Sequence, residues 1–215
     1  MLLIKAMENL YITLSGRGES LLEERKSTFL GYACPVSNEQ EALDFINEIR
    51  HKHADARHNV YAYILDKNNI VRYSDDGEPQ GTAGIPVLEV LKKSGVKNVA
   101  VVVTRYFGGI LLGTGGLVRA YSACAKLALD DAGILELEPF EQLSFEVDYS
   151  LYQKVQNEFD KFELIVDEVT FLEKVGLKLA IKAALADRFC ERIREFSAGR
   201  VEVKRGDMRF DCLKK

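Results

Sequence analysis

One segment of the chain constrains its fold more than any other, an apolar run followed by a cluster of glycines. Residues 98–104 (NVAVVVT) are almost entirely apolar, which predicts a strand that is buried on both faces of a sheet. The residues that follow, RYFGGILLGTGGLVRAY at 105–121, hold five of the sixteen glycines. A helical pattern begins at about residue 115 and stops before Gly133, a residue type that commonly terminates helices. The segment therefore predicts a buried strand, a glycine-rich turn and a helix.

Glycines between a strand and a helix serve either packing or ligand binding. Without a side chain, they let the backbone pass close to a neighbouring element. They also leave free N–H groups at the first helical turn, where the helix dipole favours a negative charge. The spacing matches neither G-x-x-x-x-G-K-[ST] nor G-x-G-x-x-G. We expect Gly108 and Gly109 to serve the turn. The residues expected to face a ligand such as phosphate are Gly113, Thr114, Gly115 and Gly116.

Three carboxylates lie close together ahead of another predicted helix, at residues 83–94. They belong to the segment SDDGEPQGTAG at 74–84 and are Asp75, Asp76 and Glu78. Acidic side chains at such a position complement the helix dipole, and the segment has ordinary turn composition. The same acids could hold Mg²⁺, which proteins bind through one or two carboxylates together with phosphate oxygens. The sequence leaves both interpretations open.

Two arginines flank the glycine-rich turn. Arg105 ends the apolar strand, and Arg119 lies one turn into the helix that follows. Arginine suits the recognition of phosphate or carboxylate groups because its donors form a planar fork. The alternative for Arg105 is a salt bridge to Asp75, Asp76 or Glu78, and the sequence does not decide between the two.

The three histidines, His51, His53 and His58, lie within eight residues. His51 and His53 fall at the end of a predicted helix, where a cationic group suits the dipole. No cysteine lies near them in sequence, so a zinc site is not indicated. His58 opens the next strand, and we expect it to face the same surface as the three acids. No Ser/His/Asp or Cys/His arrangement is legible, so we predict no catalytic residues.

The hydrophobic pattern divides near residue 138 and predicts an α+β protein of two domains, residues 1–138 and residues 139–215. Ser37 or Asn38 is expected to cap the first helix of the first domain. The elements expected in that domain are strands at 10–15, 27–36, 59–65, 70–74 and 98–104, and helices at 39–52, 83–94 and 115–131.

A short acidic linker centred on Pro139, GILELEPFEQ, is expected to precede the second domain. Apolar residues then alternate with polar ones at Leu143, Phe145 and Val147, which is typical of a half-buried strand. The resulting βαββαβ order is the ferredoxin-like pattern. The predicted elements are strands at 142–148, 163–171, 174–183 and 199–205, and helices at 150–161 and 186–197.

The composition excludes several classes of protein. Residues 1–138 carry 15 basic and 18 acidic side chains, net −3, and residues 139–215 carry 14 and 15, net −1. Neither half would capture nucleic acid through its overall charge, although a local basic face is compatible with these numbers. No apolar run approaches the ~18 residues of a membrane span, and no signal peptide is legible. The four cysteines form no C-x-x-C pair, which suits a reducing compartment. We expect a cytoplasmic protein without membrane association; its first residue could be Met1 or Met7.

Two blocks of the sequence together point to a family. They are NVAVVVTRYFGGILLGTGGLVRAY and, upstream of it, YSDDGEPQGTAGIPVLEVL. In this order and spacing they closely resemble the IMPACT family, whose bacterial members are called YigZ-type proteins. ADARHNVYAYI is similar to the family's histidine-containing strand, and the C-terminal βαββαβ pattern is similar to the second domain of bacterial members. The resemblance covers almost the whole chain.

The resemblance implies the fold of each domain. The first domain would be like the second domain of a small-subunit ribosomal protein, a fold shared with part of elongation factor G and with GHMP kinases. The second would be like the ferredoxin-like last domain of elongation factor G. Eukaryotic relatives regulate translation through protein contacts, but we expect no counterpart here of their N-terminal partner-binding domain.

On these grounds we expect a non-catalytic binding protein connected with translation. It would contact RNA, the ribosome or a translation factor through the glycine-rich turn, with Arg105, Arg119 and His58 beside it. The alternative is a phosphate-ligand-binding protein or a Mg²⁺-dependent enzyme that uses the same pocket, by analogy with GHMP kinases. A third hypothesis is a protein–protein module that docks through an apolar face of the second domain's sheet.

Overall fold

The computed structural model describes residues 10–213, so the question of a start at Met7 lies outside the described residues. Residues 11–136 form one compact unit, and the residues from 137 onward belong to another. Both units combine helices with antiparallel strands, so the chain is an α+β protein. Within the described part of the chain, no helix is long and apolar enough to cross a membrane.

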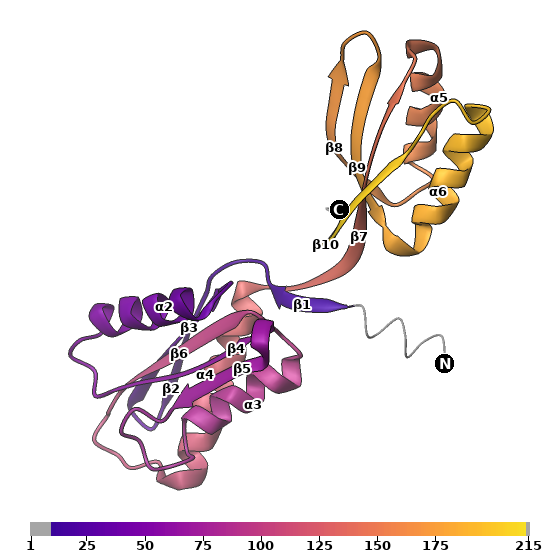
Figure 1. The fold of residues 1–215 in the computed structure, drawn as a ribbon. Helices are drawn as coiled ribbons and strands as arrows, with labels where there is room; N and C mark the ends of the chain where they lie inside the picture. Colours follow the sequence, from indigo (N-terminus) through magenta and orange to yellow (C-terminus); the bar gives the residue numbers. More distant parts are fainter. Residues whose placement is uncertain (1–9, 214–215) are drawn as a thin grey trace, which may run out of the picture. The chain divides into compact units, whose positions relative to one another are not determined.

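The first unit is built on a five-stranded antiparallel sheet with the strand order β2-β3-β6-β4-β5. Figure 1 shows this sheet with helices on both of its faces. The strands of the sheet are β2 (Gly18–Glu24), β3 (Ser27–Pro35), β4 (His58–Leu65), β5 (Ile70–Ser74) and β6 (Val99–Tyr106). The remaining elements of the unit are the strand β1 (Tyr11–Leu14), the helices α2 (Glu39–Lys52), α3 (Gly84–Ser94) and α4 (Gly113–Ala132), and the 3-10 turn η1 (Lys67–Asn69).

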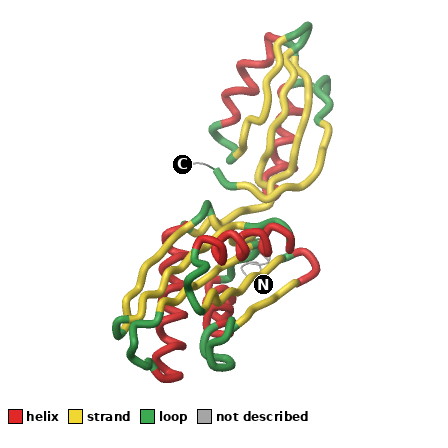
Figure 2. Tube along the Cα trace, turned by 90° about the vertical axis from the view of Figure 1, so that its left-hand side faces the viewer, coloured by secondary structure: helices red, strands yellow, loops and turns green. Residues whose placement is uncertain are grey.

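Strand β6 lies at the centre of the sheet and is buried on both faces. Val99, Val101 and Val103 pack into the core beneath α3 and α4, whereas Ala100 and Val102 pack into a second core beneath α2. This three-layer arrangement explains why the run is apolar at every position rather than at alternate ones. The predicted buried strand is therefore confirmed, and Figure 2 shows the helix layers around it.

The predicted helices of the first unit are confirmed, but one strand was missed. Asn38 caps α2, because its side chain accepts a hydrogen bond from the backbone N–H of Glu41. The missed strand is β2, whose sequence GESLLEE has only two apolar side chains. It pairs along its whole length with β3, and Gly18 lets it approach α4 so closely that a Cβ would lie 2.3 Å from the carbonyl oxygen of Ala128. The absence of a side chain at Gly18 therefore lets β2 pack against α4, and it also removes an apolar residue from the pattern by which the strand could have been predicted.

The second unit is a four-stranded antiparallel sheet with the order β10-β7-β9-β8 and both helices packed into a single core. Figure 1 shows α5 and α6 together on one face of this sheet, with no helix on the other. Its elements are β7 (Ile134–Val147), α5 (Tyr149–Phe159), β8 (Leu164–Phe171), β9 (Val175–Lys182), α6 (Ala183–Phe196) and β10 (Lys204–Asp211).

Two predictions for this part of the chain were wrong. The acidic segment around Pro139 is not a linker, because β7 continues through it from Ile134. The last strand is β10 (Lys204–Asp211) and not residues 199–205. The two errors have one cause, since β10 pairs with the stretch that was taken for the linker, with Phe210 opposite Pro139. The pairing of β9 with β7 ends at Phe140, so Pro139 pairs with β10 but not with β9. Such a position, like one on an edge strand, tolerates a residue without a backbone N–H.

His53 departs from the expected role of a cationic residue at a helix end. It is the C-cap of α2, but its ring is buried between two tyrosines. Its Nε2 lies 2.7 Å from the hydroxyl oxygen of Tyr32 and its Nδ1 lies 3.0 Å from that of Tyr106. Burial lowers the pKa of His53, and the positive charge of Lys52 lowers it further. The side chain is therefore held in its neutral form rather than as a cation.

This burial predicts a dependence of stability on pH. Because the pKa of His53 is lower in the folded state, the unfolded chain takes up a proton first as the pH falls below about 6.5. The contribution of His53 to the free energy of unfolding should thus be constant above about pH 7 and decrease as the pH falls below about 6.5. Urea titrations across this range should show a smaller decrease in His53→Gln than in the wild type. His51→Gln, which changes an exposed histidine, should keep the wild-type slope; equal slopes in all three proteins would contradict the assignment.

Candidate functional site

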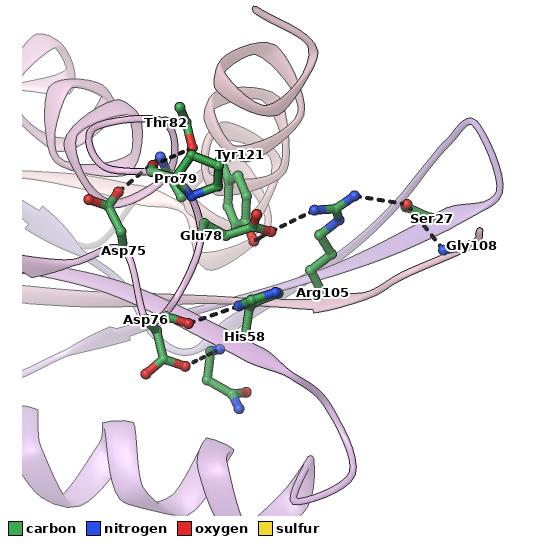
Figure 3. Close-up of polar contacts among 12 residues, drawn as sticks. Ser27, His58, Asp75, Asp76, Glu78, Pro79, Thr82, Arg105, Gly108 and Tyr121 are labelled. Carbon is green, nitrogen blue, oxygen red and sulfur yellow. Dashed lines mark hydrogen bonds and ion pairs between the residues drawn. The ribbon is translucent and has the colours of Figure 1, made fainter. Parts of the chain in front are cut away.

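The residues singled out in the sequence meet at one end of the first sheet. Strands β5 and β6 end where β3 and β4 begin, because neighbouring strands run antiparallel. We call this the glycine-rich end, formed by residues 25–27, 57–58, 74–84 and 105–116. Helices α3 and α4 both begin here, and Figure 3 shows the polar contacts among its side chains.

Arg105 is paired inside the protein and does not face solvent. Its Nη1 donates to Oε1 of Glu78 at 2.7 Å, and the two residues are only 5% and 9% exposed. Tyr121 of α4 donates to the same oxygen at 2.8 Å. Of the two alternatives for Arg105, the salt bridge is the one observed. The arginine is therefore not free to bind a phosphate, and its prediction as a phosphate ligand is not supported.

The other donors of Arg105 connect it to the neighbouring hairpin. Nη2 donates to Oγ of Ser27 at 3.3 Å, and the backbone N–H of Gly108 donates to the same oxygen. Nε is buried without a hydrogen-bond partner. Burial raises the pKa of Tyr121, and the negative charge of Glu78 raises it further, so the phenol stays protonated and remains a donor. Glu78, Arg105 and Tyr121 thus form a buried network that ties α4 to the sheet.

Asp75 serves the backbone of the loop before α3. Its Oδ2 accepts from the N–H of Gly81 at 2.8 Å, and its Oδ1 accepts from those of Ala83 and Gly84 at 3.1 and 2.8 Å. These donors include the first N–H groups of α3, which otherwise have no partner within the helix. Asp75 therefore acts as the helix cap that the sequence suggested as one of two interpretations.

Asp76 and His58 hold each other in place. The carboxylate of Asp76 accepts from the backbone N–H of Asn59 at 2.7 Å and from Nη2 of Arg50 at 3.1 Å. His58 Nδ1 donates to the backbone carbonyl of Asp76 at 2.8 Å. A carbonyl oxygen can only accept, so in the neutral ring the proton lies on Nδ1 and the lone pair on Nε2. His58 is partly exposed and does face the segment of the three acids, as predicted.

The three acids do not form a metal site. Each carboxylate is directed to separate partners, respectively the loop amides, Arg50 with Asn59, and Arg105 with Tyr121. Among the described residues, no group of three or more histidine, cysteine, aspartate and glutamate side chains could hold a metal ion. The Mg²⁺ interpretation of Asp75, Asp76 and Glu78 therefore finds no support in their geometry.

The first turn of α4 differs from that of α3, because none of the described side chains caps it. Gly113, Thr114 and Gly115 are exposed, and Gly113 has a positive φ of 72°. A Cβ on Gly115 would meet only Nη1 of Arg119, at 3.5 Å. Arg119 is exposed and forms no ion pair or hydrogen bond with any described residue. Open amides and an unpaired guanidinium therefore lie side by side.

Several residues that shape this end were not predicted. Ser27 and Tyr121 were missed because a single polar side chain within an apolar pattern gives no signal of its partner. Phe29 and Phe107 were missed because an aromatic residue in or next to an apolar strand does not show which side chain its ring contacts. Both ring centroids lie 5.5 Å from the guanidinium carbon of Arg105. Of these four residues, only Phe107 could have been linked to the site from the sequence, because it lies next to the glycine-rich turn.

The second unit has a groove of about 530 Å³, which lies on the helix-free face of its sheet. Charged side chains of both signs line it, among them Lys174, Lys204 and Glu202, and Lys178 pairs with Glu168 at 2.7 Å. The third hypothesis expected an apolar docking face on this sheet, whereas the residues that line this groove are largely charged.

The sequence matches two family models and several proteins along most of its length. Residues 25–129 match the Impact N-terminal domain, and residues 145–200 match a domain of unknown function, DUF1949. The IMPACT family member YvyE of Bacillus subtilis is 37% identical over 201 residues, which cover 93% of each chain. The chain belongs to the IMPACT family.

Other members of the IMPACT family support the same assignment. The family member YigZ of Escherichia coli is 33% identical over 84% of this chain and 90% of its own. Protein IMPACT of Homo sapiens is 38% identical, but only over 43% of this chain and 30% of its own. A solved structure described as the crystal structure of a hypothetical protein superposes with a TM-score of 0.58 at 30% identity, over 91% of this chain and 96% of that one. The Impact match includes the whole glycine-rich end.

Proposed function

We propose that this IMPACT-family protein is a non-catalytic binding protein associated with translation or its regulation. It contacts RNA, on the ribosome or free, through the glycine-rich end of the first unit. The observation that carries the proposal is the uncapped start of α4 beside Arg119, a guanidinium without a partner among the described residues. Exposed N–H groups at a helix start and an unpaired arginine are both groups that proteins use to bind phosphate.

The pairing of the acids supports this proposal over a catalytic one. Free carboxylates would repel an RNA backbone, but Asp76 and Glu78 are paired with Arg50 and Arg105, which offset their charge. Asp75 accepts hydrogen bonds from loop amides. The same bonds make them unsuited to activate water or to hold Mg²⁺. The second candidate is a phosphate-ligand-binding protein that uses the same surface, because His58 keeps one ring nitrogen without a bond to any described residue. A Mg²⁺-dependent enzyme would require these acids to leave their present partners.

The fold relationships form part of the proposal. We infer that the first unit shares the fold of the second domain of a small-subunit ribosomal protein, and that the second unit is ferredoxin-like, as in elongation factor G. The strand order β10-β7-β9-β8 with two helices on one face supports the latter. We place the protein in the cytoplasm, where its four cysteines would stay reduced; all four are free thiols in this structure.

Binding of structured and single-stranded RNA at increasing salt concentrations tests the function. We expect affinity in the micromolar range at low salt and a linear decrease of log K with log salt concentration. Arg119→Ala should weaken binding about 5- to 10-fold and lower the slope by about 0.7 on single strands, because one phosphate contact is lost. Lys93→Ala removes an exposed lysine near the other end of α3 and should bind like the wild type.

Gly115→Ala separates binding from stability. The added methyl group meets no backbone atom, and alanine favours a helix over glycine by up to about 1 kcal/mol. The variant should therefore be as stable as the wild type or more stable. Its Cβ nevertheless lies where a phosphate would approach the amides, so RNA affinity should fall about 10-fold. Fluorescence anisotropy and urea unfolding measure the two effects.

Two results would overturn this function. Millimolar RNA affinity at low salt in the wild type would exclude RNA as the ligand. Thermal stabilisation by a nucleotide or phosphorylated metabolite with Mg²⁺, lost in Asp76→Asn, would favour the enzyme instead. Asp44→Asn, which removes an exposed carboxylate on α2, serves as the control for the change of charge.

A further inference from the structure

Phe107 is an exposed aromatic side chain that the fold holds in place. It follows β6 directly and is 47% exposed. Its ring centroid lies 5.5 Å from the guanidinium carbon of Arg105, within the range of a cation–π contact. Arg105 is in turn fixed by Glu78 and Ser27. One part of the ring thus contacts a buried, immobile cation, and the rest is open to solvent.

The backbone on either side of Phe107 is also fixed. Tyr106 pairs with Thr28 as the last residue of β6. Gly108 lies directly against the β2–β3 turn, so close that a Cβ would be 1.8 Å from the carbonyl oxygen of Lys26. The ring is therefore presented from a rigid base, which reduces the entropy lost when a partner binds to it. Leu111, four residues further on, is 80% exposed and extends the apolar surface of the turn.

Three basic side chains lie at the same end of the sheet as the exposed ring. Lys26 adjoins Gly108, and Arg119 adjoins Gly115. Arg57 directly precedes His58, which lies opposite Arg105 in the sheet. All three side chains are exposed, and none forms an ion pair or a hydrogen bond within the described part of the chain. A basic surface with an exposed aromatic ring is the combination by which proteins bind single-stranded nucleic acid, since any base can stack on the ring while lysine and arginine contact the phosphates.

We propose that Phe107 is a base-stacking platform for single-stranded RNA. One unpaired base stacks on the exposed side of the ring, and the neighbouring phosphates lie toward Arg119 and the first turn of α4. Arg105 positions the ring and does not contact the RNA, because Glu78 already neutralises it. A duplex would bind less well, since its bases are stacked on one another and offer no free face. The inference rests on the function proposed above and names its ligand class.

Phe107→Leu tests the platform, because leucine keeps the apolar character and removes the aromatic face. With a labelled twelve-residue oligouridine, the wild type should bind about 5- to 100-fold more tightly than the variant, as expected for one stacked base. Phe107→Tyr should bind like the wild type. Phe171→Leu changes another half-exposed phenylalanine, in the second unit, and should have no effect. Urea unfolding of each variant shows whether the fold is retained.

An oligonucleotide of equal length with abasic sites isolates the stacking contribution. The wild type and Phe107→Leu should bind it equally, and both should show the same salt dependence with oligouridine, because no phosphate contact has changed. If Arg119→Ala weakens binding but Phe107→Leu does not, the platform is excluded while the proposed function stands. If the wild type binds duplex and single strand equally well, the platform is likewise excluded. If no RNA binds, both proposals fail.

Discussion

Replacing Glu78 by alanine is expected to lower the free energy of unfolding by about 3–5 kcal/mol. The substitution leaves Arg105 buried without its counter-ion, and an unpaired buried charge is strongly destabilising. It also removes the acceptor of the Tyr121 hydroxyl, which is fully buried. Urea denaturation followed by circular dichroism measures the loss. The first unit should unfold at lower denaturant concentration, while the second unit has its own core and should be unaffected.

The matched control is the other ion pair at the glycine-rich end. Arg50 and Asp76 lie 3.1 Å apart, but their side chains are 40% and 28% exposed. Arg50→Ala should therefore cost only about 0–1 kcal/mol. A double variant, Glu78→Leu with Arg105→Met, should recover much of the stability, since apolar side chains of similar volume often replace a buried pair without loss. If Glu78→Ala destabilised the protein no more than Arg50→Ala, the buried network would not hold α4 to the sheet.

The sequence was sufficient wherever the pattern was local. The run at 98–104 could be placed in the middle of a sheet because a strand that is buried on both faces has apolar residues at every position. The helices could be bounded by their caps, as at Asn38 and Gly133, because capping depends on neighbouring residues only. In both cases the information lies within a few residues of the element itself.

Errors arose where a partner distant in sequence decides the structure. Strand β2 carries few apolar side chains, and it is a strand because β3 pairs with it and Gly18 fits against α4. The segment around Pro139 contains the residue types of a linker, yet β10 pairs with it.

The candidate site shows the same limit. Arg105 could have been paired with any of three acids or with a ligand. The choice of Glu78 follows from the fold, since Glu78 is the acid whose side chain is buried beside α4, whereas Asp75 and Asp76 turn toward backbone amides. What could be predicted is that these groups lie at one end of one sheet. Which of them remain open to a ligand could not be predicted, because it depends on which partners already occupy them.

The glycine-rich turn contains one glycine that packing makes indispensable, and Gly108→Ala is expected to destabilise the first unit by about 3 kcal/mol or more. The Cβ would lie 1.8 and 2.0 Å from the carbonyl oxygen and carbon of Lys26, and 2.5 Å from the amide nitrogen of Ser27. All three are backbone atoms of the β2–β3 turn, so no side chain can rotate away, and the cost falls at the upper end of that for overpacking.

Displacement of this turn would also weaken the bonds that Ser27 accepts from Gly108 and Arg105. Gly115→Ala in the same turn is the control, because its nearest neighbour is the flexible side chain of Arg119 at 3.5 Å. Thermal and urea unfolding of the two variants compare a glycine needed for packing with one that packing does not need. Equal stability of the two would mean that the strand end and the hairpin can separate without cost, and Phe107 would then have no fixed base. A large loss in Gly108→Ala alone would show that the two roles of the glycines, packing and exposure of amides, belong to different residues of the same turn.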